Sequence, residues 1–256
     1  MTATNRFAVL PVEIFSNILE YLDWSDLGRL DTALINRFMR NGYLCALKIR
    51  KMKVERNEFW RKALDREIFI SWLIRRNIRV ISWDLRVDNT ELISIANGLP
   101  QLQSLDISCK FRNGTNITDE GIRAVANGLP QLQSLNICNC SKITDAGIIA
   151  VANGLPQLQS LDISVLYSET SNITDEGLRA LASGLHQLQS LDIRGCGNIT
   201  DEGIRAVASG CPQLQSLNIH GCSNIYDAGI RALASGLPLN YNFWILVIVI
   251  RLLTKE

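Results

Sequence analysis

Two hydrophobic periods alternate along most of this 256-residue chain. In the segment that starts at Leu132, the apolar residues first follow the spacing of a short buried strand, at Leu132, Leu135 and Ile137. The next apolar residues follow the i, i+3, i+4, i+7 spacing of an amphipathic helix, at Ile148, Val151, Ala152 and Leu155. The segment therefore predicts one strand followed by one helix.

Capping residues mark both ends of the predicted helix. Thr144 and Asp145 stand at its start, where their side-chain oxygens can accept hydrogen bonds from free N–H groups. Gly154 and Pro156 stand at its end, and both residue types stop helices. The same order of cap, apolar stripe and glycine recurs in the segments that begin at Ile117, Ile173, Ile199 and Ile225.

This strand–helix unit is repeated along the chain. The sequence QLQSL begins at Gln101, Gln131, Gln157, Gln187 and Gln213, so the repeat length alternates between 30 and 26 residues. A fixed period of this size is typical of a solenoid. Because one unit buries too little apolar surface to offset the cost of ordering its chain, the units must stack into a parallel sheet with helices outside. A degenerate unit that begins at Val80 is predicted to cap the N-terminal end.

The repeated pattern LxxLxIxxCxxITDxGI resembles the cysteine-containing class of leucine-rich repeats, which is common in F-box proteins. The resemblance extends from Val80 to about Pro238. It implies an α/β fold, a right-handed leucine-rich-repeat solenoid with a parallel concave sheet and outer helices.

The chain contains seven cysteines, an odd number that does not suit a disulfide framework. Cys140, Cys196 and Cys222 occur once per turn, whereas zinc sites usually take ligands in CxxC pairs. We expect a ladder of buried, reduced thiols and no metal site or cofactor, with Cys211 at a further core position. Five Asn-x-Ser/Thr sequences are interpreted as by-products of the repeat, at Asn113, Asn116, Asn139, Asn172 and Asn198.

Residues 10–40 predict a small helical bundle. Pro11 suits the first turn of a helix, and the apolar stripe that follows includes Ile14, Ile18 and Leu22. Ser25 can cap a second helix. So short a bundle cannot bury all of its large apolar side chains, so we expect an exposed patch that a partner protein covers.

The same segment resembles an F-box, a small all-α domain. The matching pattern is Leu-Pro, a Glu-Ile pair, an Ile-Leu-x-Tyr-Leu run and a later Asp-Leu, whereas the Cys and Trp usual in the family's third helix are missing from DTALINRFMR. The resemblance implies docking on a Skp-type adaptor of a cullin-based ubiquitin ligase. The adaptor-binding residues would be Leu10, Pro11, Ile14, Ile18, Leu19, Leu22, Leu27 and Leu30. A helical cap that only shields the first repeat is the alternative for this segment.

Charge divides the chain into two parts. Residues 1–79 contain 15 Lys and Arg against 9 Asp and Glu, and residues 80–256 contain 11 against 16. The basic stretch 46–79 includes Phe59, Trp60 and Trp72, a mixture that can bind nucleic acid. Because acidic residues are interspersed, we favour a solvated connecting helix and expect no nucleic-acid partner.

The C-terminal run Phe243–Leu253 is strongly apolar. As a helix, its eleven residues would rise only ~16 Å, which is short of the ~30 Å of a bilayer core. We therefore predict a β-rich capping segment over 239–256 and no membrane partner. The N-terminus lacks the pattern of a secretory signal, so we expect a cytoplasmic or nuclear protein.

Alternation along each strand places three residues per turn on the concave face, for example Ser160, Asp162 and Ser164, with Ser108 and Cys138 at positions equivalent to Ser164. The two histidines, His186 and His220, do not occur with Ser and Asp in the sequence order of a catalytic triad. We therefore expect no enzyme and no catalytic residues. The predicted target-binding residues lie on this face and on the edge loops: Arg86, Asp106, Phe111, Arg112, Asn136, Asp162, Tyr167, Asp192, Arg194, Asn218 and His220.

The predicted domain order is an F-box-like helical domain at 1–45, a basic helical connector at 46–79, the leucine-rich repeats at 80–238 and the capping segment at 239–256. This order is that of F-box proteins with leucine-rich repeats. The resemblance implies a substrate-recognition subunit of a Skp–cullin–F-box ubiquitin ligase that binds the adaptor, the cullin core and an unknown target, and is a monomer outside the complex. The alternative is a ligase-independent cytosolic leucine-rich-repeat scaffold or inhibitor.

Overall fold

The computed structural model describes residues 52–54, 70–71, 74, 80–84, 87–109, 116–165 and 171–236. The chain divides into two compact units, Met1–Ile81 and Ser82–Glu256. In the first unit the structure describes the strand β1 (Met52–Val54), residues 70–71 and 74, and the first residues of β2 (Val80–Asp84). The predicted bundle at 10–40 and the capping segment at 239–256 lie outside the described residues.

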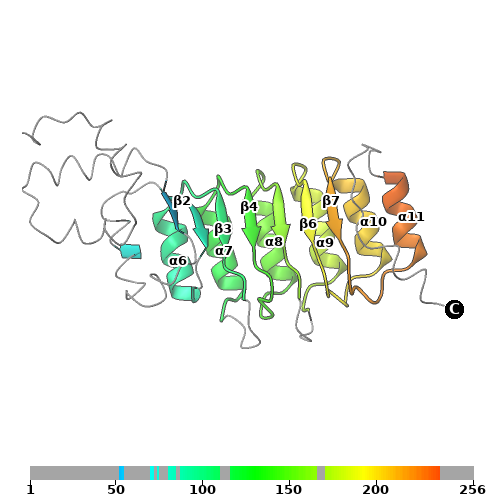
Figure 1. The fold of residues 1–256 in the computed structure, drawn as a ribbon, viewed down its shortest axis with the longest axis horizontal. Helices are drawn as coiled ribbons and strands as arrows, with labels where there is room; N and C mark the ends of the chain where they lie inside the picture. Colours follow the sequence, from blue (N-terminus) through cyan, green and yellow to red (C-terminus); the bar gives the residue numbers. More distant parts are fainter. Residues whose placement is uncertain are drawn as a thin grey trace, which may run out of the picture. The chain divides into compact units, whose positions relative to one another are not determined.

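The second unit is a stack of strand–helix turns, with the strands on one side and the helices on the other (Figure 1). The strands after β2 are β3 (Ser104–Asp106), β4 (Ser134–Asn136), β5 (Ser160–Asp162), β6 (Ser190–Asp192) and β7 (Ser216–Asn218). The helices are α6 (Asn89–Gly98), α7 (Asp119–Gly128), α8 (Asp145–Gly154), α9 (Asp175–Gly184), α10 (Asp201–Gly210) and α11 (Asp227–Gly236).

From β2 to β7, each strand pairs in parallel with the next strand along the chain, and equivalent residues lie opposite each other. Leu105 pairs with Leu135, Leu135 with Leu161, and so on to Leu217 in β7. Trp83 in β2 takes the place of this leucine and is fully buried beside Leu105. The predicted alignment of the degenerate first unit with the later repeats is therefore confirmed.

The core lies between the strands and the helices. The predicted helix residues Ile148, Val151, Ala152 and Leu155 are all buried, and so are their equivalents in the neighbouring turns. Helix α8 begins after Thr144, whose side-chain oxygen accepts a hydrogen bond from the Ala146 N–H, and ends at Gly154. Both helix ends are therefore where the sequence predicts them.

Close packing of neighbouring helices depends on the last glycine of each helix from α7 to α11. A Cβ atom on Gly154 would lie 2.8 Å from both the carbonyl carbon and the Cβ of Ala126 in the preceding helix. Gly184 and Gly210 meet Ala152 and Ala182 in the same way. Because backbone atoms cannot move aside, only glycine allows neighbouring helices to approach this closely.

A second set of contacts joins each helix start to the next turn. In the middle turns, the first aspartate of a helix accepts hydrogen bonds from the N–H and the hydroxyl of the capping threonine that follows, at 2.8–2.9 Å and 2.6–2.7 Å. We call this set the helix-start ladder; its pairs are Asp119–Thr144, Asp145–Thr174, Asp175–Thr200 and Asp201–Tyr226, where only the Tyr226 N–H donates.

Candidate binding face

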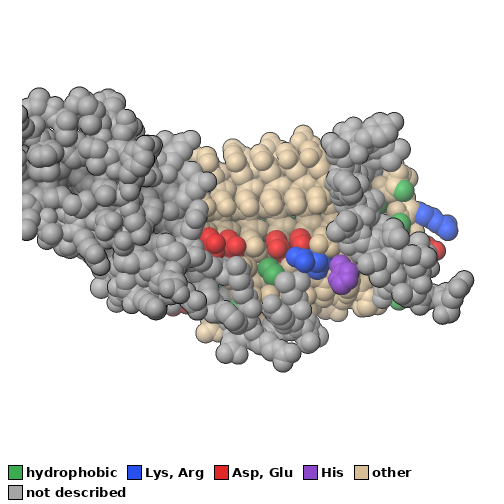
Figure 2. Space-filling view, in the orientation of Figure 1, with side chains coloured by type: hydrophobic (Ala, Val, Ile, Leu, Met, Phe, Trp, Pro, Cys, Tyr) green, Lys and Arg blue, Asp and Glu red, His purple; other side chains and the backbone are tan. Residues whose placement is uncertain are grey.

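The strands present a mostly uncharged polar face, and a row of acidic side chains crosses it at the strand ends (Figure 2). The row is formed by the last residue of each strand from β3 to β7. We call it the strand-end row: Asp106, Asn136, Asp162, Asp192 and Asn218. All five were predicted as target-binding residues.

Each side chain in the strand-end row folds back onto its own turn. One side-chain oxygen accepts a hydrogen bond from the backbone N–H two residues later, at 2.9–3.3 Å. This arrangement is an Asx turn, and either Asp or Asn can make it. In addition, the amide of Asn136 donates to Asp106 at 3.4 Å, and that of Asn218 donates to Asp192 at 3.3 Å. These side chains therefore have a structural role in ending the strands.

Asp162 and Asp192 lie on neighbouring strands in equivalent positions. Burial raises the pKa of Asp162, hydrogen bonds from Ser164 oppose this effect, and the negative charge of Asp192 adds to the rise. The Asp162 carboxylate accepts a 2.6 Å hydrogen bond from the Ser164 hydroxyl. Two carboxylates side by side favour a cationic neighbour.

Arg194 supplies that positive charge. Its Nε donates to both carboxylate oxygens of Asp192, at 2.9 and 3.0 Å, and this hydrogen bond is the main cause that raises the pKa of the guanidinium. The side chain of Arg194 remains 35% exposed. His220 follows the next strand and is exposed, and its carbonyl accepts a hydrogen bond from the N–H of Gly195 at 2.8 Å. Arg194 and His220 are thus neighbouring polar side chains that reach solvent.

The third position of the strand pattern departs from the prediction in the turns of β3, β4 and β5, whereas Arg194 and His220, at the same position in the turns of β6 and β7, are half-buried and exposed. Ser108, Cys138 and Ser164 were expected on the open face, but all three are buried. The chain turns after the strand-end residue, and the Ser164 hydroxyl packs 3.1 Å from the Cys138 sulfur. In these three turns the strand ends at the strand-end residue, and the alternation of exposed and buried side chains does not extend to the third position.

The predicted thiol ladder is confirmed. Cys140, Cys196 and Cys222 are buried, and their sulfurs donate to carbonyl oxygens of the preceding turn, at 3.8, 3.5 and 3.1 Å. Burial raises the pKa of Cys196 to about 11 and that of Cys222 to about 12. Cys211 is also buried, and its pKa is raised to about 11 for the same reason. These thiols stay protonated at neutral pH, which makes them poor nucleophiles.

The loop asparagines use their amides inside the solenoid. The amide of Asn139 donates to Cys109 O at 2.7 Å, that of Asn172 to Ser141 O at 2.8 Å, and that of Asn198 to Ser171 O at 2.6 Å. An amide in these positions holds two turns together. The interpretation of these Asn-x-Ser/Thr sequences as products of the repeat is consistent with these bonds.

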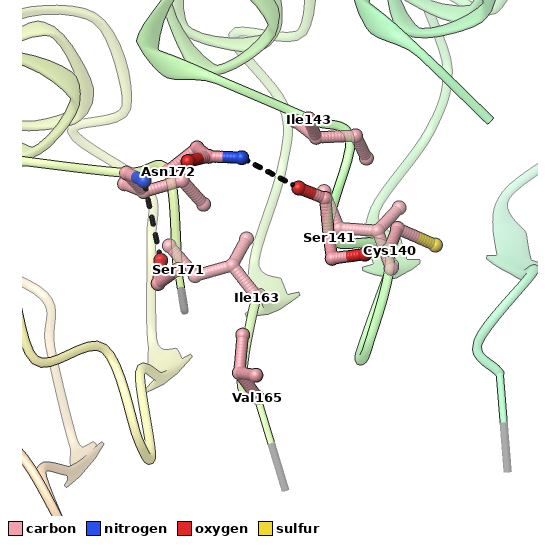
Figure 3. A pocket seen from close by; sticks show the side chains of 9 residues that line it. Cys140, Ser141, Ile143, Ile163, Val165, Ser171 and Asn172 are labelled. Atoms are coloured by element: carbon pink, nitrogen blue, oxygen red, sulfur yellow. Dashed lines mark hydrogen bonds between the residues drawn. The ribbon is translucent and has the colours of Figure 1, made fainter. Parts of the chain in front are cut away.

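One small hollow lies between the β4 and β5 turns (Figure 3). Ile137, Ile163 and Ile173 line it together with Val165, and the bond from Asn172 to Ser141 crosses its rim. Its free volume is about 10 Å³, which is comparable to a single water molecule.

Within the described ranges, no group of three or more His, Cys, Asp or Glu side chains could hold a metal ion. No helix among the described residues is long and apolar enough to cross a membrane. The remaining predicted site residues lie outside the part that the structure describes: the eight adaptor-binding residues, and Arg86, Phe111, Arg112 and Tyr167 among the target-binding ones.

Comparisons with known proteins give a family match to one segment and similarity to solved structures of low sequence identity. The family model described as Leucine Rich repeat matches residues 185–208. No curated protein matches the sequence. Two such structural neighbours are the complex of Rad7 and Elc1 from yeast, at 20% identity and a TM-score of 0.38, and the leucine-rich-repeat-containing protein LegL7 from Legionella pneumophila, at 15% and 0.44.

The alignments cover 68% and 70% of this chain but 57% and 60% of the two neighbours, so the chain spans less than two thirds of either. The matched residues 185–208 begin directly after α9, include β6 and end inside α10, so they span most of one turn of the stack. Six parallel strands alternate with six helices over the described residues 80–236. The fold of this unit is a leucine-rich-repeat solenoid.

Proposed function

We propose that this chain is the target-recognition subunit of a Skp–cullin–F-box ubiquitin ligase. The observation that carries the proposal is the order of two patterns: the F-box-like sequence at residues 10–30 precedes a solenoid of cysteine-containing leucine-rich repeats. The first pattern supplies the adaptor contact, and the solenoid supplies a surface for a target protein.

The open strand face supports the second half of this proposal. Helices cover one side of the sheet, and the other side carries short polar side chains with the strand-end row across it. Because the row residues are engaged in Asx turns, the side chains best placed to contact a target are Arg194 and His220. Arginine is enriched among the residues that dominate protein interfaces. Asp192 already orients Arg194, so less side-chain freedom is lost on binding.

Co-purification with a Skp-type adaptor tests the first half. The full chain should co-elute with the adaptor, and the double variant Leu10→Asp with Ile18→Asp should not, because it places charges in the predicted apolar stripe. Asn17→Asp is the matched control, since Asn17 lies on the polar side of the same predicted helix. Absence of co-elution for the unaltered chain, or equal co-elution of all three proteins, would contradict the adaptor role.

Cross-linking of the adaptor-bound complex in cells tests the second half. The variant Arg194→Ala with His220→Ala should still co-elute with the adaptor but lose target proteins that the unaltered chain cross-links. Arg231→Ala is the control, because Arg231 is exposed on α11, on the helix side. An unchanged set of cross-linked proteins would remove Arg194 and His220 from the target-binding surface while leaving the adaptor result intact.

A further inference from the structure

The edge of β7 repeats the backbone groups with which the inner strands bind their successors. From β6, the N–H groups of Ile193 and Gly195 donate to Asn218 O and His220 O at 3.0 and 2.8 Å. The carbonyl of Gln189 accepts from the N–H groups of Gln215 and Ser216 at 2.8 and 2.9 Å. The three equivalent groups of the β4 turn form the same hydrogen bonds to the β5 turn. Successive turns are thus joined by the same three backbone groups each time.

In β7 the equivalent groups are the N–H of Ile219, the N–H of Gly221 and the carbonyl of Gln215. None of these three has a hydrogen-bond partner among the residues that the structure describes. A strand edge with free donors and acceptors in regular order binds another strand readily. The edge of β7 therefore offers a site for one more parallel strand.

The helix layer at this end is also less covered than in the inner turns. Ile204 and Ala208 of α10 are 0% and 3% exposed. Their equivalents in α11, Ile230 and Ala234, are half-buried and exposed. Tyr226, which precedes α11, is 61% exposed. The end face thus combines a free strand edge with half-buried or exposed apolar side chains whose equivalents in the inner turns are buried.

The sequence that follows α11 fits this face in register. Gly236-Leu237-Pro238 matches Gly210-Cys211-Pro212, and in four earlier turns a buried leucine stands five residues after the proline, as Leu217 does after Pro212. Phe243 stands five residues after Pro238, and Ile245 then corresponds to Ile219. Aromatic and β-branched residues favour strands.

We infer that residues 241–246 bind the edge of β7 as an added parallel strand and close the end of the solenoid. In the repeat register, the N–H of Ile219 donates to Trp244 O, and the N–H of Gly221 donates to Leu246 O. Phe243 and Ile245 then extend the core column of Leu217 and Ile219, whereas Trp244 lies on the opposite side of the strand. In this register, Asn240 stands at the position that Leu214 occupies in the preceding turn.

This inference assigns the apolar run to the protein's own core, not to a lipid bilayer or to a second copy of the chain. It is independent of the ubiquitin-ligase proposal, because it concerns how the solenoid ends. It also predicts that a charged side chain is disruptive in place of Phe243, which faces the core, and is tolerated in place of its neighbour Trp244, which does not.

Amide hydrogen exchange in the full chain tests the inference. The amides of Ile219 and Gly221 should be protected in the unaltered chain, and Phe243→Asp should speed their exchange by at least about tenfold, because the added strand is lost. Trp244→Asp is the matched control and should leave their protection unchanged. The equivalent amides of Ile163 and Val165 in the inner strand β5 report whether the rest of the stack stays folded in both variants.

Three results would overturn the inference. In the first, the Ile219 and Gly221 amides exchange at the rate of unstructured amides in the unaltered chain. In the second, Phe243→Asp and Trp244→Asp have equal effects, including equal loss of the whole fold. In the third, protection appears only as the protein concentration rises or when phosphatidylcholine vesicles are added, which would identify a second copy or a membrane as the occupant.

Discussion

Aspartate occupies two positions in the turns of this solenoid, at the helix starts and at the strand ends, and the two positions have different partners. In the helix-start ladder, both carboxylate oxygens bind groups of the following turn. In the strand-end row, one oxygen binds the N–H two residues later in the same turn. The ladder joins neighbouring turns, whereas the row shapes the end of each strand.

This difference explains which residues each position accepts. The threonine of the next turn donates from its N–H and from its hydroxyl, and only a carboxylate offers two acceptor oxygens for these two donors. In the first turn Asn89 stands at this position, and there its amide donates to Thr118 Oγ1 while its oxygen accepts from the Thr118 N–H. The Asx turn of the strand-end row needs one acceptor oxygen only, so both Asp and Asn occur there.

The largest effect is expected where helices meet. Gly154→Ala places a Cβ against backbone and Cβ atoms of Ala126, which should lower the free energy of unfolding by about 3 kcal/mol. Gly197→Ala is the control, because its Cβ would meet only Ser223 Oγ at 3.5 Å. Urea unfolding of both variants measures the difference. A Gly154→Ala protein as stable as Gly197→Ala would show that the helix layer can adjust.

The helix-start ladder should give the next largest effect. Asp175→Ala removes both hydrogen bonds to Thr200 and should cost about 2 kcal/mol, at about 1 kcal/mol for each bond. Asp227→Ala is the matched control at the equivalent position of α11, where no hydrogen bond to Asp227 occurs among the described residues. Equal unfolding free energies for the two variants would mean that the ladder does not hold the turns together.

The strand-end row should give the smallest effect, with the opposite sign. Asp162→Asn keeps the Asx turn and removes a partly buried charge beside Asp192, so it should stabilise the fold by about 0.5 kcal/mol at pH 7. Because the pKa of Asp162 is raised in the folded state, its ionised form is the unfavourable one. The gain should therefore be present at neutral pH and vanish as the pH falls below the ordinary Asp value of 3.8.

Thermal unfolding between pH 3 and pH 7 measures this dependence. Asp192→Asn is the control, because it removes the partner of Arg194 and should not stabilise the protein. Stabilisation of equal size in both variants would show that the general negative charge of the face, and not the burial of Asp162, controls the effect.

Much of the fold can be predicted from the sequence because every turn repeats the same pattern of apolar and capping residues. The helix boundaries at Thr144 and Gly154, the buried columns and the alignment of Trp83 with Leu105 all follow from periodicity and capping residues. The cross-turn bonds do not follow, because they depend on the offset between neighbouring helices. Thr144 was predicted to cap its own helix, and the sequence contains no signal that it also binds Asp119.

The geometry of the strand face was predicted less well, for a related reason. Strand alternation correctly places Asp162 and Asp192 at the surface, but it continues to Ser164, which is fully buried. The alternation of side chains between the two faces of a strand does not indicate at which residue the strand ends. The Asp-x-Ser sequence itself is a signal that could have been used, since Asp before a turn often accepts the N–H two residues later.

The unshifted pairing of the strands has a consequence for how such a chain can change in length. One 30-residue turn plus one 26-residue turn separates Gln131 from Gln187. Joining Pro130 directly to Gln187 would set Ser104 opposite Ser190 and bring Asp119 to Thr200, the same kinds of neighbours that exist now. A pair of turns can therefore be removed or inserted as a unit. Such a change shortens or lengthens the solenoid by 56 residues and creates no new type of contact between turns.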